Sequence, residues 1–254
     1  MLGTLFLFLI IVLLFAVIFF FTPQPATENK KQQTFETTSW EYQQEQAKKE
    51  SEAEKNKKWF SPQRWLTDKE IDWACQRIKT DTMPGSFPGQ ELERFKILPA
   101  HQFHYLKEAP RNEAGVYLAF SELLQALTGF GGELVFIPVN NPDFHWSLLV
   151  YETATKRFYH YDTLKGANYG YVKPLVKELL QQIHQTNHPD LKQYLVKKHE
   201  IKQGNGWDCG VAVITLIKRI SEKYWDSLEE IELGVFDFKK EREELRKEYL
   251  TTNE

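Results

Sequence analysis

The stretch FHWSLLVYETATKRFYHYD, residues 144–162, contains two runs rich in β-branched and aromatic residues, with a short polar loop between them. Runs of this length and composition are typical of β-strands, and two such runs joined by a few polar residues indicate a hairpin. A third run, ELVFIPV at residues 133–139, comes shortly before them. These three strands are predicted to form the centre of a sheet.

The hairpin brings a histidine and an aspartate together. If Tyr151 pairs with Lys156 across a four-residue loop, His145 lies directly opposite Asp162. Opposed side chains share one face of a sheet, with Cβ atoms roughly 5 Å apart. A five-residue loop would instead slip the register by one residue and move one side chain to the other face. A carboxylate in this place would fix the imidazole tautomer and stabilise the imidazolium.

A second informative stretch, GNGWDCGVAVITLIKRI, spans residues 204–220 and predicts an apolar helix from Cys209 to about Ile220. Asp208 is suited to the N-cap, which puts Cys209 in the first helical turn. Unpaired N–H groups and the positive end of the helix dipole favour a thiolate there, and the thiolate is the nucleophilic form of cysteine.

The residues around Cys209 extend this hypothesis. The side-chain amide of Gln203 and the backbone N–H of Cys209 are candidate donors to the oxyanion of a carbonyl under attack. Gly210 is expected to leave room for a substrate backbone, and Gly204 and Gly206 suit a loop with unusual dihedral angles.

The remaining elements are helices and one further strand, grouped in blocks around the three predicted strands. Thr67 and Glu70 form a capping-box pattern at the start of the first helix. Blocks of helix and strand, without strict alternation, argue for the α+β class. The expected helices span residues 68–77, 113–127, 172–184 and 236–250, and the further strand lies within residues 193–201. Cys75 falls inside the first helix and is interpreted as a packing residue.

The N-terminal segment has a different composition. Residues 1–27 carry no charged side chain, and LGTLFLFLIIVLLFAVIFFF at 2–21 is about as long as the apolar helix that crosses a bilayer. A cleaved signal peptide is the alternative, but its basic start and small-residue cleavage site are not evident. We expect a transmembrane anchor at residues 1–22 and a charged, partly helical linker at 23–60. Lysines cluster after the apolar segment, which predicts that residues beyond it face the cytosol.

The overall composition limits the class of protein. The 254 residues are 42% hydrophobic and 26% charged, with a formal charge of only -3. Residues 61–254 therefore predict one globular domain, and nucleic acid is not expected as a partner. Two distant cysteines cannot make a disulfide framework or a structural zinc site, and no metal site or cofactor is expected.

Taken together in this order, HWSLLVY, HYDTL and Q-x-N-x-x-DCG resemble the SUMO-protease family of cysteine proteases, a member of clan CE. The resemblance extends from about residue 65 to about residue 220, and His145-Trp146, Asp162, Gln203, Asn205 and Asp208-Cys209-Gly210 match family positions. Trp65-Leu66-Thr67-Asp68 is similar to the family's Trp-Leu-Asn-Asp motif, with Thr67 in place of Asn. The stretch at 145–163 looks especially like the deneddylating branch.

The resemblance implies a papain-like α+β fold, with a central, mostly antiparallel sheet flanked by helices. It also implies a triad in which Cys209 is the nucleophile, His145 the general base and acid, and Asp162 the residue that orients His145. Trp65 and Trp146 would cover a Gly-Gly tail in a narrow tunnel. Asp68 would meet a basic residue of the ubiquitin-like substrate, although its place in a first helical turn explains the same charge through the helix dipole.

The expected function is that of a membrane-anchored cysteine isopeptidase, which cleaves after the C-terminal Gly-Gly of ubiquitin, the neddylation modifier or SUMO. A clan-related protein acetyltransferase and an inactive binder of ubiquitin-like proteins are the alternatives. By analogy, a compact protease on an anchor suits a bacterial effector whose catalytic domain works in the host cytosol.

Overall fold

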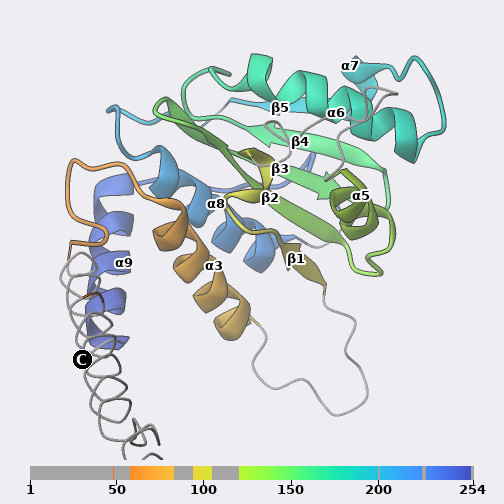
Figure 1. Cartoon of the computed structure of the whole chain (residues 1–254). Coiled ribbons are helices and arrows are strands. Elements are labelled where there is room, and N and C mark those ends of the chain that lie inside the picture. The colour runs from red at the N-terminus through yellow and green to blue at the C-terminus, as the bar shows by residue number, and fades with distance from the viewer. Residues whose placement is uncertain are drawn as a thin grey trace, which may run out of the picture. The chain divides into compact units, whose positions relative to one another are not determined.

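The computed structural model describes residues 48, 58–82, 94–104, 120–199, 201–224 and 227–252, and Lys58–Glu254 forms one compact unit (Figure 1). The transmembrane anchor predicted at 1–22 lies outside the described residues, as does the linker predicted at 23–60 apart from residues 48 and 58–60. In the part of the chain that is described, no helix has the length and apolar character needed to cross a membrane.

The described elements follow the predicted order of helix, sheet and helix. They are α3 (Asp68–Thr82), β1 (Phe95–Ile97), α5 (Phe120–Thr128), β2 (Leu134–Asn141), β3 (His145–Glu152), β4 (Arg157–Tyr161), α6 (Tyr169–Ile183), α7 (Leu191–Tyr194), β5 (Leu195–Lys198), α8 (Cys209–Lys223) and α9 (Phe238–Thr252).

The five strands form one sheet in the order β1-β2-β3-β4-β5. Its two inner pairings are antiparallel and its two outer pairings are parallel, so the sheet is mixed and the expectation of a mostly antiparallel sheet is wrong at both edges. The reason is connectivity: α6 and α7 carry the chain back across the sheet between β4 and β5, and such a crossover returns a strand in the parallel direction. The sequence analysis missed β1, whose three residues are too few to show a period.

Both faces of the sheet are covered, which explains why its strands are apolar almost throughout. On one face, Leu148 and Val150 of β3 pack in a core cluster with α3, α8 and α9. On the other face, Leu149 and Tyr151 pack in a second cluster with α5 and α6. Figure 1 shows the same three layers, with the sheet between the two groups of helices.

The β3–β4 hairpin has a four-residue loop, as predicted, but its register differs by one residue in each strand. Glu152 pairs with Arg157, whereas the sequence analysis paired Tyr151 with Lys156. Lys156 has a φ of 54°, a left-handed conformation that belongs to the turn and not to the strand. Because the total change is two positions, the predicted side chains stay on a common face of the sheet.

The first turn of α3 has the predicted capping box. The backbone N–H of Thr67 donates to Glu70 Oε2 at 2.8 Å, and the N–H of Glu70 donates back to Thr67 Oγ1 at 3.4 Å. Glu70 is fully buried and also accepts from the N–H of Phe60 at 2.7 Å. The capping residues thus hold the start of the domain against α3.

Candidate active site

The predicted histidine and aspartate lie at the end of the sheet where β3 begins and β4 ends. His145 Nε2 is 2.8 Å from Asp162 Oδ1, and both side chains are buried. In the observed register they are diagonal neighbours on one face, a distance that a long imidazole side chain covers. The structure therefore confirms the contact but not the directly opposed pairing that predicted it.

Asp162 is held by the chain that follows it. Its Oδ1 also accepts from the N–H of Leu164 at 2.9 Å, and its Oδ2 accepts from the N–H of Asn168 at 2.8 Å. Burial alone would raise the pKa of Asp162, but the hydrogen bonds from His145 and these two N–H groups lower it to about 2. The carboxylate is thus charged and fixed in direction.

Cys209 is the first residue of α8, as predicted, and is almost fully buried. Its thiol interacts with the imidazole of His145. Asp162 occupies Nε2, and the buried Nδ1 has no hydrogen-bond partner in the described part of the chain, so Nδ1 is the ring nitrogen left for the sulfur. The three groups therefore have the spatial order of thiol, imidazole and carboxylate that a nucleophilic triad requires.

The imidazole is held in its protonated form by its two neighbours. Burial lowers the pKa of His145, but the hydrogen bonds and charges of Asp162 and Cys209 outweigh burial and raise it to about 9. At neutral pH the ring is therefore an imidazolium beside the sulfur. This is the arrangement in which a cysteine is a ready nucleophile and the histidine a ready acid.

Gln203 lies in the loop that leads to Cys209. Its Oε1 accepts from the hydroxyl of Thr163 at 2.5 Å, and its Nε2 donates to the carbonyl of Asn205 at 2.6 Å. An amide nitrogen has two hydrogens, and the second has no acceptor among the described residues. The amide is thus fixed in place with one N–H remaining for an oxyanion, so the predicted role stays chemically open to it.

The glycines near Cys209 differ in what surrounds them. A Cβ on Gly210, in the first turn of α8, would lie 2.9 Å from Leu66 Cβ, so this glycine makes room for Leu66. The approach of a substrate backbone to Gly210 stays a prediction. Gly204 and Gly206 do not have positive φ, and a Cβ on either would meet nothing within 4 Å. The prediction of unusual dihedral angles is therefore wrong at both positions.

The two tryptophans that were expected to cover a Gly-Gly tail are linked to different segments. Trp146 is buried, and its Nε1 donates to the carbonyl of Leu66 at 3.0 Å. Trp65 is 39% exposed, and its Nε1 donates to the carbonyl of Gly206. Gly206 lies in the loop at residues 203–208 that directly precedes Cys209, here called the nucleophile loop. The tunnel remains a prediction.

Asp68 lies in the first turn of α3 and is half-buried. Its Oδ1 accepts from Asn140 Nδ2, at the end of β2, at 2.9 Å. This bond gives the carboxylate a partner inside the domain, and the predicted contact with a basic substrate residue remains a prediction.

Asn168 is a site residue that sequence reasoning missed. It occupies the N-cap of α6, yet its side chain makes no capping bond. Instead, Nδ2 donates to the carbonyl of His145 and to Ser147 Oγ, both at 3.1 Å, while its backbone N–H binds Asp162. One residue thus positions both partners of the His–Asp pair. The sequence analysis began this helix at residue 172, three residues later than α6 begins, so Asn168 was not recognised as its N-cap.

Asp208 departs from its prediction in a similar way. It is the N-cap residue of α8, but its carboxylate makes no capping bond to the helix. It accepts instead from Arg242 Nε at 2.8 Å and from Asn205 Nδ2 at 2.6 Å. Arg242 belongs to α9, which was predicted as a helix at 236–250 without any site residue.

Two exposed apolar side chains adjoin the triad residues in sequence. Phe144 is 51% exposed, and its ring lies 6.3 Å from that of His145, centroid to centroid. Leu164 is 37% exposed and follows Asp162 by two residues. The sequence analysis did not select either, although exposed apolar side chains beside a reactive group are typical of substrate contacts.

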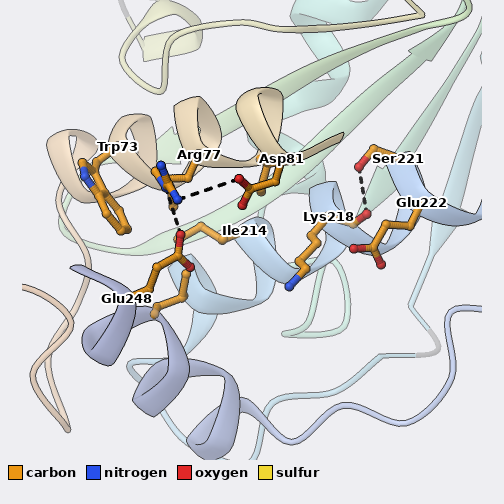
Figure 2. Close-up of a pocket in the computed structure, with 11 residues that line it drawn as sticks. Trp73, Arg77, Asp81, Ile214, Lys218, Ser221, Glu222 and Glu248 are labelled. Carbon is orange, nitrogen blue, oxygen red and sulfur yellow. Dashed lines mark hydrogen bonds and ion pairs between the residues drawn. The ribbon is translucent and has the colours of Figure 1, made fainter. Parts of the chain in front are cut away.

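A pocket of about 420 Å³ between α3, α8 and α9 lies apart from this site, and none of its described lining residues belongs to the triad (Figure 2). Within the described residues, no group of three or more His, Cys, Asp or Glu side chains is placed to bind a metal ion.

Comparison with known proteins gives related sequences and folds. The Ulp1 protease family, C-terminal catalytic domain, matches residues 64–251. A probable sentrin-specific protease 8 of Dictyostelium discoideum is 28% identical over 168 residues, which are 61% of this chain and 65% of that protein. The chain thus spans just under two thirds of the length of this curated relative.

Solved structures share the fold. The C-terminal Ulp1 protease domain in complex with Smt3, the yeast ortholog of SUMO, is 18% identical with a TM-score of 0.53, over 78% of this chain and 81% of that one. The Xanthomonas campestris effector protein XopD bound to ubiquitin is 21% identical with a TM-score of 0.52, over 72% of this chain and 91% of that one.

Proposed function

Because this chain belongs to the Ulp1 protease family, we propose that it is a cysteine isopeptidase that cleaves after the C-terminal Gly-Gly of ubiquitin or a ubiquitin-like protein. The observation that carries the proposal is the 2.8 Å contact between His145 Nε2 and Asp162 Oδ1, together with the interaction of the same imidazole with Cys209. Binding of a ubiquitin-like protein alone does not require a protonated histidine beside a thiol.

In the first step, Cys209 Sγ attacks the carbonyl carbon of the terminal glycine, and the carbonyl oxygen becomes an oxyanion. The remaining N–H of Gln203 and the backbone N–H of Cys209 are the donors we assign to it. When the C–N bond breaks, the imidazolium of His145 gives its proton to the departing lysine amine. This leaves a thioester on Cys209 and a neutral imidazole.

In the second step, the neutral imidazole accepts a proton from water as the water oxygen attacks the thioester carbonyl. The C–S bond breaks, the sulfur departs as the thiolate beside the newly protonated His145, and the glycine leaves as a carboxylic acid that gives its proton to bulk water. Asp162 stays ionised throughout and keeps the ring in place. The site then has the same charges as at the start.

The substrate class has support from sequence motifs and relatives. The stretch at 145–163 resembles the deneddylating branch, and the matched structures include a Ulp1 domain bound to Smt3 and XopD bound to ubiquitin. Trp65 donates to Gly206 of the nucleophile loop, and Trp146 donates to Leu66, the residue next to Trp65. A requirement for Gly-Gly follows if the two indoles cover the tail.

The test compares turnover of three reporters, in which ubiquitin, the neddylation modifier or SUMO is joined through Gly-Gly to a lysine side chain. At least one reporter should release its lysine product with wild-type protein and none with Cys209→Ala. Absence of cleavage, together with transfer of an acetyl group from acetyl-CoA to a target protein, would replace the proposal with the acetyltransferase alternative. Binding of a modifier without either reaction would indicate an inactive binder.

We further propose that residues 1–22 anchor the enzyme in a membrane with the catalytic domain in the cytosol. The support is the uncharged apolar run at 2–21, followed by a cluster of lysines. In sealed vesicles whose cytosolic face points outward, added protease should remove the domain. Protection of the domain would reverse the topology, and recovery of the whole chain in the soluble fraction would exclude the anchor.

A further inference from the structure

The nucleophile loop is bonded to the C-terminal helix by one buried arginine. Arg242 of α9 donates from Nε to Asp208 Oδ1 at 2.8 Å, from Nη2 to the carbonyl of Trp207 at 2.9 Å, and from Nη1 to the carbonyl of Ser61 at 3.1 Å. The side chains of Arg242 and Asp208 are each only 5% exposed. The guanidinium therefore joins α9 to the nucleophile loop and to the segment at Ser61.

From this geometry we propose that Arg242 is a positioning residue that sets the reactivity of Cys209 by neutralising and redirecting the carboxylate of Asp208. The inference rests on the proposed cysteine-protease chemistry. It assigns to α9, which contributes no triad residue, a function in catalysis.

The bonds from Arg242 and Asn205 turn the carboxylate of Asp208 away from the first turn of α8. An aspartate at an N-cap normally accepts from an N–H group of the first helical turn. Asp208 does not, because Arg242 and Asn205 take its two oxygens. The N–H groups at the start of α8 are therefore not used by this carboxylate and remain for the sulfur and for the oxyanion.

Arg242 also offsets the negative charge of Asp208 beside Cys209. A buried carboxylate one residue from the nucleophile disfavours a second negative charge on the sulfur, since like charges interact strongly at low dielectric constant. The guanidinium of Arg242 offsets this effect. Without it, Asp208 would be an uncompensated buried charge beside Cys209.

Three buried or part-buried ion pairs come from the elements packed around α8 and from the loop before it. His145 pairs with Asp162, from β3 and the end of β4, and Glu70 of α3 pairs with Arg64. The third pair joins Asp208, which directly precedes Cys209, to Arg242 of α9. A change in the Asp208–Arg242 pair therefore alters a charge one residue from the sulfur and outside the triad.

The chain offers a matched control at the other end of α9. Figure 2 shows Arg77 of α3 pointing to Glu248 of α9, with Arg77 Nε 3.0 Å from Glu248 Oε1 and Asp81 close by. This contact also joins α9 to a neighbouring helix through an arginine, but it is partly exposed and contains no residue of the nucleophile loop. Arg77→Gln therefore removes an α9 ion pair and leaves the surroundings of Cys209 intact.

The experiment measures the rate of Cys209 alkylation by iodoacetamide against pH, in the full chain, with Cys75→Ala as background. This rate follows the thiolate and needs no substrate. Arg242→Gln should move the midpoint of the profile up by at least one pH unit, which is a slowing of about tenfold on the acid side of the midpoint. Asp208→Asn should move it down, because Arg242 then lacks its counter-charge. Arg77→Gln should leave it unchanged.

A purely structural role for Arg242 predicts other results. If the role is purely structural, Arg242→Gln and Asp208→Asn should slow alkylation alike, or both pH profiles should stay at the wild-type position. Either outcome overturns the proposal. The double variant Asp208→Asn with Arg242→Gln removes both charges, so its profile should lie close to the wild-type position even if Arg242→Gln alone does not fold. A double-variant profile displaced upward by a full pH unit would also contradict the proposal. Because alkylation requires no reporter, the inference can fail while the proposed proteolysis stands, and the reverse.

Discussion

Two helices that pack against each other carry the two cysteines of the chain, and the two thiols have different electrostatic surroundings. Cys75 lies within α3 and Cys209 begins α8, and both are nearly fully buried members of one core cluster. Burial, with the nearby carboxylate of Asp72, raises the pKa of Cys75 to about 12. Cys209 instead meets an imidazole whose pKa is raised to about 9.

The difference shows that burial does not decide whether a cysteine reacts. A buried thiol in mid-helix sees backbone that is already hydrogen-bonded and apolar side chains, so its charged form is excluded. At a helix start, the thiol meets unpaired N–H groups and, in this protein, an imidazolium. Position along the helix and the facing side chain, both set by the fold, separate a packing residue from a nucleophile.

The largest expected effect comes from replacing each of the two cysteines by alanine in turn. Cys209→Ala should abolish turnover of a Gly-Gly reporter, because the nucleophile is gone. Cys75→Ala should keep the wild-type rate and lose only about 1 kcal/mol of stability through a small cavity. Steady-state kinetics and urea unfolding of both variants make this check, and reduced turnover in a folded Cys75→Ala protein would refute the assigned difference.

The next prediction removes the group that charges the imidazole. Asp162→Ala should lower kcat by about 100-fold or more, since His145 loses both its orientation and the partner that raises its pKa. Asp162→Asn keeps an acceptor for the ring without the charge, so its loss should be smaller. Equal kcat values for the two substitutions would mean that the hydrogen bond to the ring adds nothing beyond the charge, and a wild-type kcat for Asp162→Asn would mean that the charge has no part in the difference between the cysteines.

Gln203 tests whether the environment of Cys209 also serves the transition state. Gln203→Ala should lower kcat about 100- to 1,000-fold with a smaller change in KM, as expected for loss of an oxyanion donor. Because its Oε1 also accepts from Thr163, the variant Thr163→Val is the matched control. It removes that bond without removing the amide and should retain most of the activity.

Titration of His145 sharpens the comparison further. With its pKa raised to about 9, the ring should keep its proton through neutral pH, and kcat should fall as pH rises past 9 because the leaving amine loses its acid. The same shift adds stability that is complete below pH 6.5 and is lost as pH rises through about 9. The lowered pKa of Asp162, about 2, adds stability above pH 3.8 that is lost as pH falls toward 2.

NMR of the imidazole against pH measures this titration directly. In Cys209→Ala, where the sulfur no longer contributes, the midpoint should fall below the wild-type value. The same midpoint in both proteins would show that the thiol and the imidazole are not coupled.

The smallest effect concerns how closely α8 packs at the nucleophile. Gly210→Ala should cost about 1–3 kcal/mol of stability, because the added Cβ would lie 2.9 Å from Leu66 Cβ. Gly204→Ala, with nothing within 4 Å, should be close to neutral. Chemical unfolding of both variants measures the difference. A neutral Gly210→Ala would indicate that Leu66 yields and that the start of α8 is less tightly packed than described.

Much of the site was predictable because it depends on local order in the chain. A hairpin sets which residues of two strands share a face, so His145 and Asp162 were found together even though the register was off by one residue in each strand. A helix start is equally local, and so are the placement of Cys209 and the capping box of Thr67 and Glu70.

The parts that were missed depend on contacts between distant segments. Arg242 meets Asp208 across 34 residues of sequence, and a charged helix gives no sign that one of its arginines is buried. The same holds for Gly210, whose close neighbour Leu66 lies in another part of the chain. The parallel edges of the sheet likewise follow from how the helices cross it, and not from any period in the strands.

The most direct test of this account is the site of covalent capture in the unaltered chain. The full-length protein is treated with ubiquitin, neddylation-modifier and SUMO probes that carry a C-terminal electrophile, and the adduct is then mapped by mass spectrometry. We predict a single adduct, on Cys209, with Cys75 unmodified in the folded protein. Modification of Cys75 in place of Cys209, or no adduct with any of the three probes, would contradict the account.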